Sequence, residues 1–362
     1  MIRLGAEQYL AVGCILYIAL AQAVAPREYF AFLIQYMLMP GWALPLLLLV
    51  AFAALAIVDN PRAPLSSMRE TLRGTIVAGA SASLLFLFGV AAFTTLKFEI
   101  PESVPFYADP WLADLDHAIH AGEPWLLAHA HAPSWTPAVI EALYTQAWFT
   151  EWFGVFFFVA FWSNRPARAR YLWAFSLTLL IVGTMLATLL SSVGPILYDR
   201  IYGGDRFAGL LETLAANGNN SFLEYANYLL AAHDQRQAAF GTGISAMPSV
   251  HVAMAVLNAW FLTSLNRGVG VIGWAFAAAI LFGSVYSGWH YAIDGYVSAA
   301  ITSTIWLACG RMAYASSAAG VAVAAASVDP EKASPRSGRL TGEPAPDPPT
   351  LPCPSPARAA RQ

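Results

Sequence analysis

Charged residues are scarce in this sequence. Asp, Glu, Lys and Arg make up 11% of its 362 residues, 58% are hydrophobic, and the mean hydropathy is +0.54. A soluble domain carries about 25% charged residues, so the composition excludes an ordinary water-soluble protein. The net charge of −3 excludes a basic nucleic-acid-binding surface. Sparse lysine and abundant alanine are typical of a bacterial chain from GC-rich DNA.

Cysteine is scarce as well. Cys14 and Cys309 lie in apolar runs and Cys353 lies near the end of the chain. Their wide separation predicts neither a disulfide framework nor a cysteine-ligated metal site. We expect the protein to need no metal and no cofactor, because backbone donors at a helix end and arginines can stabilise an anionic transition state.

Long apolar segments dominate the sequence. A helix needs about 20 residues to cross a bilayer. The candidate spans are residues 8–25, 41–58, 75–96, 137–162, 171–192, 248–265, 268–286 and 292–310. They predict an all-α fold, a polytopic transmembrane bundle of about eight spans. Residues 30–39 either lie at the interface or extend the second span. We expect the first span to stay uncleaved, because Arg3 is the only positive charge before it; a signal peptide ending at Ala25 is the alternative.

The remaining segments differ in composition. Residues 97–136 hold six acidic residues and three tryptophans, and 114–127 predicts a short amphipathic helix at the lipid headgroups. Residues 193–246 read as a long loop. The alanine, serine and proline after residue 312 predict a disordered tail. The predicted parts are N-terminal transmembrane helices (1–96), an interfacial segment (97–136), a core (137–312) and the tail (313–362).

His290 and Asp294 carry the clearest chemical signal. They are four residues apart at the start of a predicted helix and therefore share one face. The carboxylate can accept the proton of one imidazole nitrogen and hold the other forward as a nucleophile. Ionisable residues at membrane depth favour a functional interpretation. The alternative is a headgroup-level pair that only stabilises the fold.

His251 lies at the start of another predicted helix and follows Pro248 and Ser249 in the sequence. Free backbone N–H groups at such an end bind phosphate oxygens, the Ser249 hydroxyl can add a donor, and His251 can protonate a leaving oxygen. Ordinary helix capping is the alternative. The two motifs lie on the same predicted face, one helical hairpin apart, so their helices can direct both histidines at one phosphorus.

Pro248-Ser-Val-His251 and His290-x-x-x-Asp294 resemble motifs of the type 2 phosphatidic acid phosphatase superfamily, which includes vanadium haloperoxidases. The resemblance implies a core of six helices within the predicted core segment. It also implies these roles: His290 as nucleophile, Asp294 as its partner, His251 as general acid and Ser249 as a phosphate ligand.

The sequence departs from most members of that superfamily. Gly283 and Ser284 stand where they carry Ser-Arg, and Phe158 replaces the lysine of their first motif ahead of Arg165-Pro166. Because of these losses and of the motif Trp289-His-Tyr-Ala-Ile-Asp294, the sequence resembles the branch of inositol phosphorylceramide synthases and their bacterial relatives. The stretch 192–200 is similar to a Gly-Pro-x-x-Tyr stretch of those bacterial proteins.

Because the usual arginines are missing, another cation must neutralise the phosphate, and a guanidinium is its favoured bidentate partner. Arg206 and Arg200 are the candidates, and Tyr198 is a candidate substrate contact. The alternatives are plain surface charges and an interfacial aromatic residue.

Arginine positions orient the bundle. They lie between predicted spans two and three, four and five, and six and seven, and after span eight: Arg62, Arg69, Arg73, Arg165, Arg168, Arg170, Arg267 and Arg311. The positive-inside rule then puts both termini in the cytoplasm. We predict an integral protein of the bacterial inner membrane with both histidine motifs on the periplasmic face.

The predicted activity is cleavage of a lipid phosphate ester through a phosphohistidine. Transfer to water makes a phosphatase, and transfer to an alcohol of a second lipid or a polyol makes a phosphotransferase. The synthase-like branch favours transfer, whereas the wider superfamily favours a plain phosphatidic acid or polyprenyl diphosphate phosphatase. The membrane and a lipid phosphate are the expected partners, with no nucleic acid. A non-enzymatic transporter or binding protein is the alternative of another class, although no repeat of interrupted helices supports it.

Overall fold

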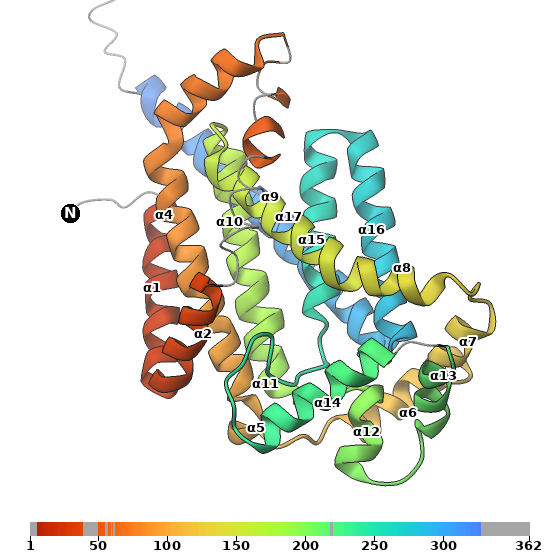
Figure 1. The fold of residues 1–362 in the computed structure, drawn as a ribbon. Coiled ribbons are helices and arrows are strands. Elements are labelled where there is room, and N and C mark those ends of the chain that lie inside the picture. The colour runs from red at the N-terminus through yellow and green to blue at the C-terminus, as the bar shows by residue number, and fades with distance from the viewer. Residues whose placement is uncertain are drawn as a thin grey trace, which may run out of the picture. The chain divides into compact units, whose positions relative to one another are not determined.

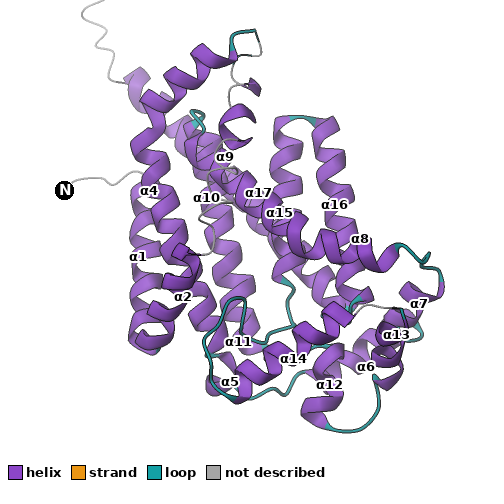
Figure 2. Cartoon of the chain, viewed as in Figure 1, coloured by secondary structure: helices purple, strands orange, loops and turns teal. Residues whose placement is uncertain are grey.

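The computed structural model describes residues 6–38, 50–54, 57–58, 60, 62–217 and 220–326. Throughout these residues the regular elements are helices, without strands (Figure 2), and the all-α prediction is confirmed. The chain divides into two compact units, Met1–Ala315 and Ser316–Gln362. Of the second unit the structure describes only helical residues 316–326.

Within the described residues, five helical segments are long and apolar enough to cross a membrane: Glu7–Val24, Arg73–Phe98, Arg165–Leu189, Arg267–Tyr286 and Ala292–Arg311. They correspond to the first, third, fifth, seventh and eighth predicted spans. The sixth is an apolar but shorter helix, Val250–Leu265. The fourth is formed by three consecutive helical pieces over residues 136–161. The second, 41–58, lies largely outside the described residues, so the count of eight stays a prediction.

The first helices form a layer of their own. They are α1 (Ala6–Val24), α2 (Pro26–Leu38) and α4 (Pro64–Phe98). Both α1 and α2 pack along α4 (Figure 1). Ala21 and Ala91 are fully buried in this layer, and such small side chains let helices approach closely.

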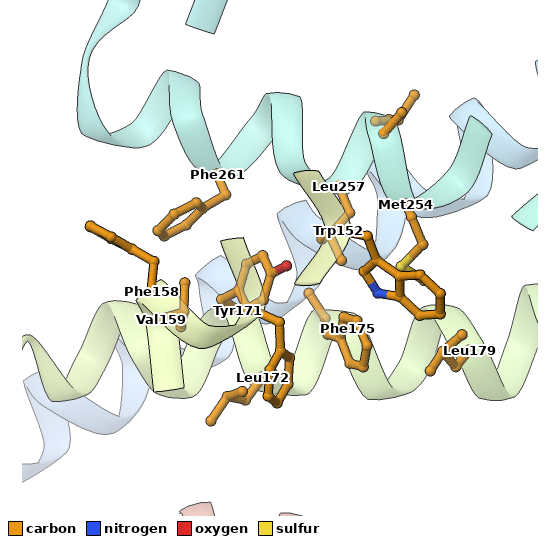
Figure 3. Packing of buried hydrophobic residues seen from close by; sticks show 14 of the residues in the cluster. Trp152, Phe158, Val159, Tyr171, Leu172, Phe175, Leu179, Met254, Leu257 and Phe261 are labelled. Carbon is orange, nitrogen blue, oxygen red and sulfur yellow. The ribbon is translucent and has the colours of Figure 1, made fainter. Parts of the chain in front are cut away.

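The central helices share an aromatic core. They are α8 (Thr136–Ala142), the π-helical turn η1 (Leu143–Ala147), α9 (Trp148–Phe161), α10 (Arg165–Leu180), the π-helical turn η2 (Ile181–Leu186), α11 (Ala187–Leu189) and α15 (Val250–Leu265). Figure 3 shows side chains of α9, α10 and α15 meeting, among them Trp152, Tyr171 and Phe261. Phe158, the expected replacement of the lysine in the first motif, is buried in this core.

The α15–α16 hairpin is closely packed because α16 (Arg267–Tyr286) places glycines against α15. A Cβ on Gly273 would lie 2.9 Å from the Cα of Ala259. The last helix, α17 (Ala292–Ala326), continues past Arg311 into the segment predicted as a disordered tail. Its alanines have the highest intrinsic helix propensity. Residues 327–362 of that predicted tail lie outside the described residues.

Short helices gather at one end of the bundle (Figure 1). They are α5 (Ile100–Ser103), α6 (Asp109–His120), α7 (Pro124–Ala130), α12 (Pro195–Tyr202), α13 (Ala208–Ala216) and α14 (Asn220–Asp234). We call α6, α7, α12, α13 and α14 the cap. Leu112, Trp125, Ile196 and Leu210 belong to its separate hydrophobic cluster.

The cap corrects the prediction of a long loop over residues 193–246, which contains three helices. Apolar side chains four residues apart, such as Leu210 and Leu214, are buried in its cluster and stabilise helices that are too short to be stable alone. The predicted amphipathic helix exists as α6 and α7. Trp111 and Ile119 are exposed on α6, and their contact with headgroups stays a prediction.

Candidate active site

His290 and Asp294 lie at the junction between α16 and α17. His290 precedes α17, and Asp294 is in its first turn. The His290 Nδ1 is 3.3 Å from Asp294 Oδ2, and the same oxygen accepts a hydrogen bond from the Tyr291 backbone N–H (3.1 Å). Asp294 is fully buried and His290 is 7% exposed. With the proton on Nδ1, the pair leaves Nε2 free to act on a ligand.

His251 faces His290 from the first turn of α15. The centroids of the two imidazole rings are 6.4 Å apart. Tyr144 stacks on the His251 ring at 4.3 Å, Trp148 lies over it at 4.1 Å, and the Trp148 indole N–H donates to the His251 carbonyl oxygen. Two aromatic rings from η1 and α9 therefore fix the orientation of this imidazole.

Ser249 is the N-cap of α15, and it is fully buried. Its hydroxyl accepts a hydrogen bond from the Val252 backbone N–H (3.4 Å), and its own N–H donates to the Asp294 carbonyl oxygen (3.5 Å). These contacts connect the starts of α15 and α17. The hydroxyl occupies a capping position and is not on the described wall of the cavity.

Both histidines line a cavity of about 410 Å³, a size that accommodates a small molecule or part of a lipid. Its wall is strongly aromatic, with Tyr144, Trp148 and Phe149 next to His251 and with Trp289 next to His290. Other described residues of the wall come from α4, α14 and the 240–245 segment. The cavity therefore combines two imidazoles with an apolar chamber.

Residues 192–196, which we call the bridge, connect the segments that precede the two histidines. The Ser192 carbonyl and hydroxyl oxygens accept from the backbone N–H groups of Ala246 (3.0 Å) and Met247 (2.9 Å). The Ile196 N–H donates to the Gly288 carbonyl oxygen (2.8 Å). The bridge thereby holds the segments before His251 and His290 in one frame.

Asp109, the first residue of α6, anchors the bridge. Its carboxylate accepts hydrogen bonds from the N–H groups of Val193 and Gly194 and from the hydroxyls of Tyr202 and Tyr291, all within 3.1 Å. Burial raises the pKa of Asp109, and these four donors oppose the rise. One fully buried carboxylate thus ties the cap to the bridge and to the residue after His290.

Asp116, two turns later on α6, caps the start of α17. Its two oxygens accept from the backbone N–H groups of Ala292 and Ile293, each at 3.1 Å. Burial raises the pKa of Asp116, opposed by these two donors and by His120. A carboxylate at a helix N-terminus also interacts favourably with the helix dipole. The cap therefore fixes the first turn of the helix that carries Asp294.

The three other predicted ligands lie elsewhere. Arg206 pairs with Asp114 (2.6 Å) and Glu123 (3.8 Å), and Arg200 donates to Asn227. Tyr198 is buried in the cap with its ring 5.2 Å from Phe207. None of the three is on the described wall of the cavity. The difference from the prediction has a physical reason, because acceptors and apolar neighbours within the cap engage these side chains.

Sequence reasoning missed several residues around the histidines. Lys97 lines the cavity from the last turn of α4; the rarity of lysine in an apolar chain was the available signal. Tyr144 and Trp148 are an aromatic pair four residues apart, a spacing that is equally typical of core packing. Asp109 and Asp116 were predicted to lie at the headgroups because their partners, backbone N–H groups and for Asp109 also two tyrosine hydroxyls, are far along the chain.

A group of three or more His, Cys, Asp or Glu side chains arranged to hold a metal ion does not occur among the described residues.

Comparisons with known proteins give one match. No curated protein and no solved structure matches this chain. The family profile described as the PAP2 superfamily matches residues 110–308. This stretch is more than half of the chain and contains His251, His290 and Asp294. The protein belongs to the PAP2 superfamily, the type 2 phosphatidic acid phosphatases and their relatives.

Proposed function

We propose that this protein is an integral membrane enzyme that cleaves a phosphate ester of a lipid through a phosphohistidine on His290. Membership of the PAP2 superfamily supports a lipid phosphatase-type function. The observation that carries the proposal is the facing pair of imidazoles, 6.4 Å apart, one of which is backed by a buried carboxylate. We propose residues 137–312 as the catalytic core.

In the first step, His290 Nε2 attacks phosphorus, and the bond between phosphorus and the lipid oxygen breaks. Asp294 accepts the Nδ1 proton in a hydrogen bond and stabilises the positive charge that develops on the ring. His251, in its protonated form, gives a proton to the departing oxygen. The products are a lipid alcohol, a phosphorylated His290 and a neutral His251.

In the second step, an acceptor hydroxyl attacks the phosphohistidine. His251 takes the hydroxyl proton as a general base, the phosphorus–nitrogen bond breaks, and His290 is released. Water as acceptor yields phosphate, and an alcohol yields a new phosphate ester. The proton balance closes, because His251 ends the cycle protonated as it began.

The cavity supports a lipid as the substrate. Aromatic side chains from α4, η1 and α9 form much of its described wall, and such a wall favours an acyl or prenyl chain over a polar metabolite. The Trp289-His290-Tyr291 sequence, together with the residues that replace the usual arginines, supports the synthase-like branch and hence transfer to an alcohol. Hydrolysis remains the second candidate, since superfamily members are generally phosphatases.

The test uses purified protein in detergent with EDTA. It is incubated separately with phosphatidic acid, a polyprenyl diphosphate and phosphatidylinositol, with and without a polyol, and both free phosphate and lipid products are followed. Transfer to water identifies a phosphatase, seen as free phosphate from phosphatidic acid or the diphosphate and as inositol phosphate from phosphatidylinositol. A new phosphate ester of the added polyol or of a second lipid identifies a phosphotransferase. With labelled substrate, an acid-labile, base-stable phosphoenzyme is expected.

The matched control compares two histidines. His290→Ala should abolish turnover and labelling. His117→Ala should leave both unchanged, because His117 lies on the exposed side of α6. Equal turnover in wild type and His290→Ala would refute His290 as the nucleophile. A complete lack of turnover and labelling in wild type on all three lipids would favour the binding-protein alternative.

A further inference from the structure

Lysine and arginine are nearly absent from the described part of the cavity wall. Among the described residues that line it, Lys97 is the only Lys or Arg. The chain has two lysines, and the other, Lys332, lies outside the described residues. A cavity that holds a phosphate dianion needs compensating positive charge, and Arg200 and Arg206 bind acceptors in the cap. Lys97 is therefore the one described candidate on the wall itself.

Lys97 is half-buried in the last turn of α4. No carboxylate lies within 4.0 Å of its ammonium group, and no hydrogen-bond acceptor is assigned to it, within the part of the chain that the structure describes. The carboxylate that shares the wall, Glu141 on α8, is not paired with it. A half-buried ammonium without a protein partner is able to bind an anionic ligand.

The acidic residues next to Lys97 are engaged elsewhere. Glu99 accepts from the Arg236 guanidinium (3.0 Å), and Glu102 pairs with the same side chain. Both carboxylates are thus paired with one arginine that is not on the described cavity wall. The arrangement keeps the two acids nearest to Lys97 in the sequence from competing with a ligand for it.

The end of α4 is also in direct contact with the segment that leads to His251. Gly243 has φ +106°, and a Cβ there would lie 3.2 Å from Phe98 N and 3.4 Å from the Lys97 carbonyl carbon. Residues 241–245, which precede Ser249 and His251, therefore pack on the backbone of Lys97 itself. This contact fixes the lysine relative to the histidines across a long sequence separation.

We propose that Lys97 binds the substrate phosphate and takes the place of the arginines that this chain lacks. The inference rests on the proposed function for the reaction, but the binding itself does not require turnover. The ligand class is a lipid phosphate ester, whose anionic oxygens meet the ammonium while the apolar chain occupies the aromatic wall. An ammonium is a compact point charge, and it suits a phosphate whose orientation is set by the histidines.

The first test observes the lysine directly. Lys332→Arg gives a protein in which Lys97 is the only lysine, and reductive methylation with a ¹³C label keeps its charge. The label is followed by NMR during titration with dioctanoyl phosphatidate, inorganic phosphate or dioctanoylglycerol. The resonance that is missing from a Lys97→Arg, Lys332→Arg double variant is Lys97.

Each titration has a defined meaning. A saturable shift with dioctanoyl phosphatidate but not with dioctanoylglycerol supports phosphate recognition by Lys97. A shift with inorganic phosphate as well shows that the headgroup alone suffices, and its absence shows that the lipid chain is needed. An unchanged Lys97 resonance at saturating dioctanoyl phosphatidate overturns the proposal, whether or not the wild type has activity.

The second test measures kcat/KM on the lipid that the wild type turns over. Lys97→Met keeps an unbranched apolar side chain but removes the charge, so kcat/KM should fall by about 100-fold. Lys97→Arg restores the charge, so its kcat/KM should lie within about 10-fold of the wild-type value. Lys332→Met is the matched control and should match wild type. Unfolding temperatures check that Lys97→Met folds. Equal kcat/KM for folded Lys97→Met and wild type overturns the inference and leaves the histidine mechanism intact.

Discussion

Gly194 lies directly against the carbonyl oxygen of Trp289, with no room for a Cβ between them. Gly194 also has φ +82°, a conformation that side chains disfavour. This contact joins the bridge to the residue before His290. The position of the proposed nucleophile therefore depends on Gly194 having no side chain.

Gly194→Ala should therefore damage both stability and activity. The positive φ alone costs alanine about 1–2 kcal/mol, and the clash must in addition displace Trp289 and His290. We expect a lower unfolding temperature and at least about a 10-fold loss of kcat/KM, because small displacements of catalytic groups are costly. Gly203→Ala is the matched control, since Gly203 has φ +76° with no neighbour within 4 Å. Equal activity losses in the two variants would contradict the role of the close contact.

Asp116→Asn should destabilise the protein by about 1–3 kcal/mol. An amide offers one acceptor oxygen to the two N–H groups of Ala292 and Ile293 and turns its own N–H₂ toward the other. Asp114→Asn, on the same helix, removes only an exposed ion pair and should cost at most about 1 kcal/mol. Thermal unfolding in detergent compares them, and similar losses would contradict capping of α17 by Asp116.

His251→Gln should show an effect that depends on the leaving group. A general acid contributes about 10²–10⁴-fold when the departing oxygen is basic, so kcat/KM for an alkyl phosphate lipid should fall by that factor. The loss for p-nitrophenyl phosphate should be much smaller, since nitrophenolate leaves without protonation. The ratio kcat/KM reports the first chemical step, which isolates the acid role from the later base role. A loss of equal size on both substrates would exclude His251 as the acid.

His129 should make the stability of the protein depend on pH. Its Nε2 lies 2.8 Å from the Tyr286 carbonyl oxygen, and its Nδ1 lies 3.4 Å from the Asn217 amide nitrogen. A neutral ring protonated on Nε2 satisfies both contacts, whereas a protonated Nδ1 would face an N–H₂ group. Burial lowers the pKa of His129 below its ordinary value of 6.5, opposed by the bond to Tyr286.

The folded protein therefore binds fewer protons at His129 than the unfolded chain does, and the free energy of unfolding falls as the pH drops below 6.5. His129→Gln removes this titration and keeps a donor for the Tyr286 carbonyl. Unfolding temperatures measured from about pH 8 to about pH 5 should fall less steeply in the variant than in wild type. Parallel curves would show that His129 does not contribute.

The histidine motifs were predictable because their geometry is local. His290 and Asp294 are four residues apart on one helix, and the hairpin between them and His251 is short, so sequence spacing alone indicates that they meet. Lys97 was not predictable in this way. Its contact with the 241–245 segment depends on the packing of α4 against that segment, and no local pattern encodes it.

The acidic residues of α6 illustrate a second limit. Asp109 and Asp116 lie in a segment whose composition is typical of the headgroup level. Their partners, however, are backbone N–H groups of the bridge and of α17 and, for Asp109, also two tyrosine hydroxyls. Backbone donors are present at every residue except proline, so a sequence does not reveal which of them a carboxylate will accept. Arg200 and Arg206 lie off the described cavity wall because acceptors inside the cap engage them, and these contacts are equally invisible in the sequence.

The π-helical turn η1 separates the packing of two helices from the surroundings of His251. A π turn accommodates an extra residue within an α-helix, so α8 and α9 keep their own packing faces, with Ile140 of α8 against Gly283 and Trp148 of α9 over His251. Tyr144, inside the turn, stacks on the same imidazole. Deletion of one residue from this turn should leave both helices in place and alter chiefly the contact of Tyr144 with His251. The turn is thus a place where the chain can change its length without repacking the membrane helices.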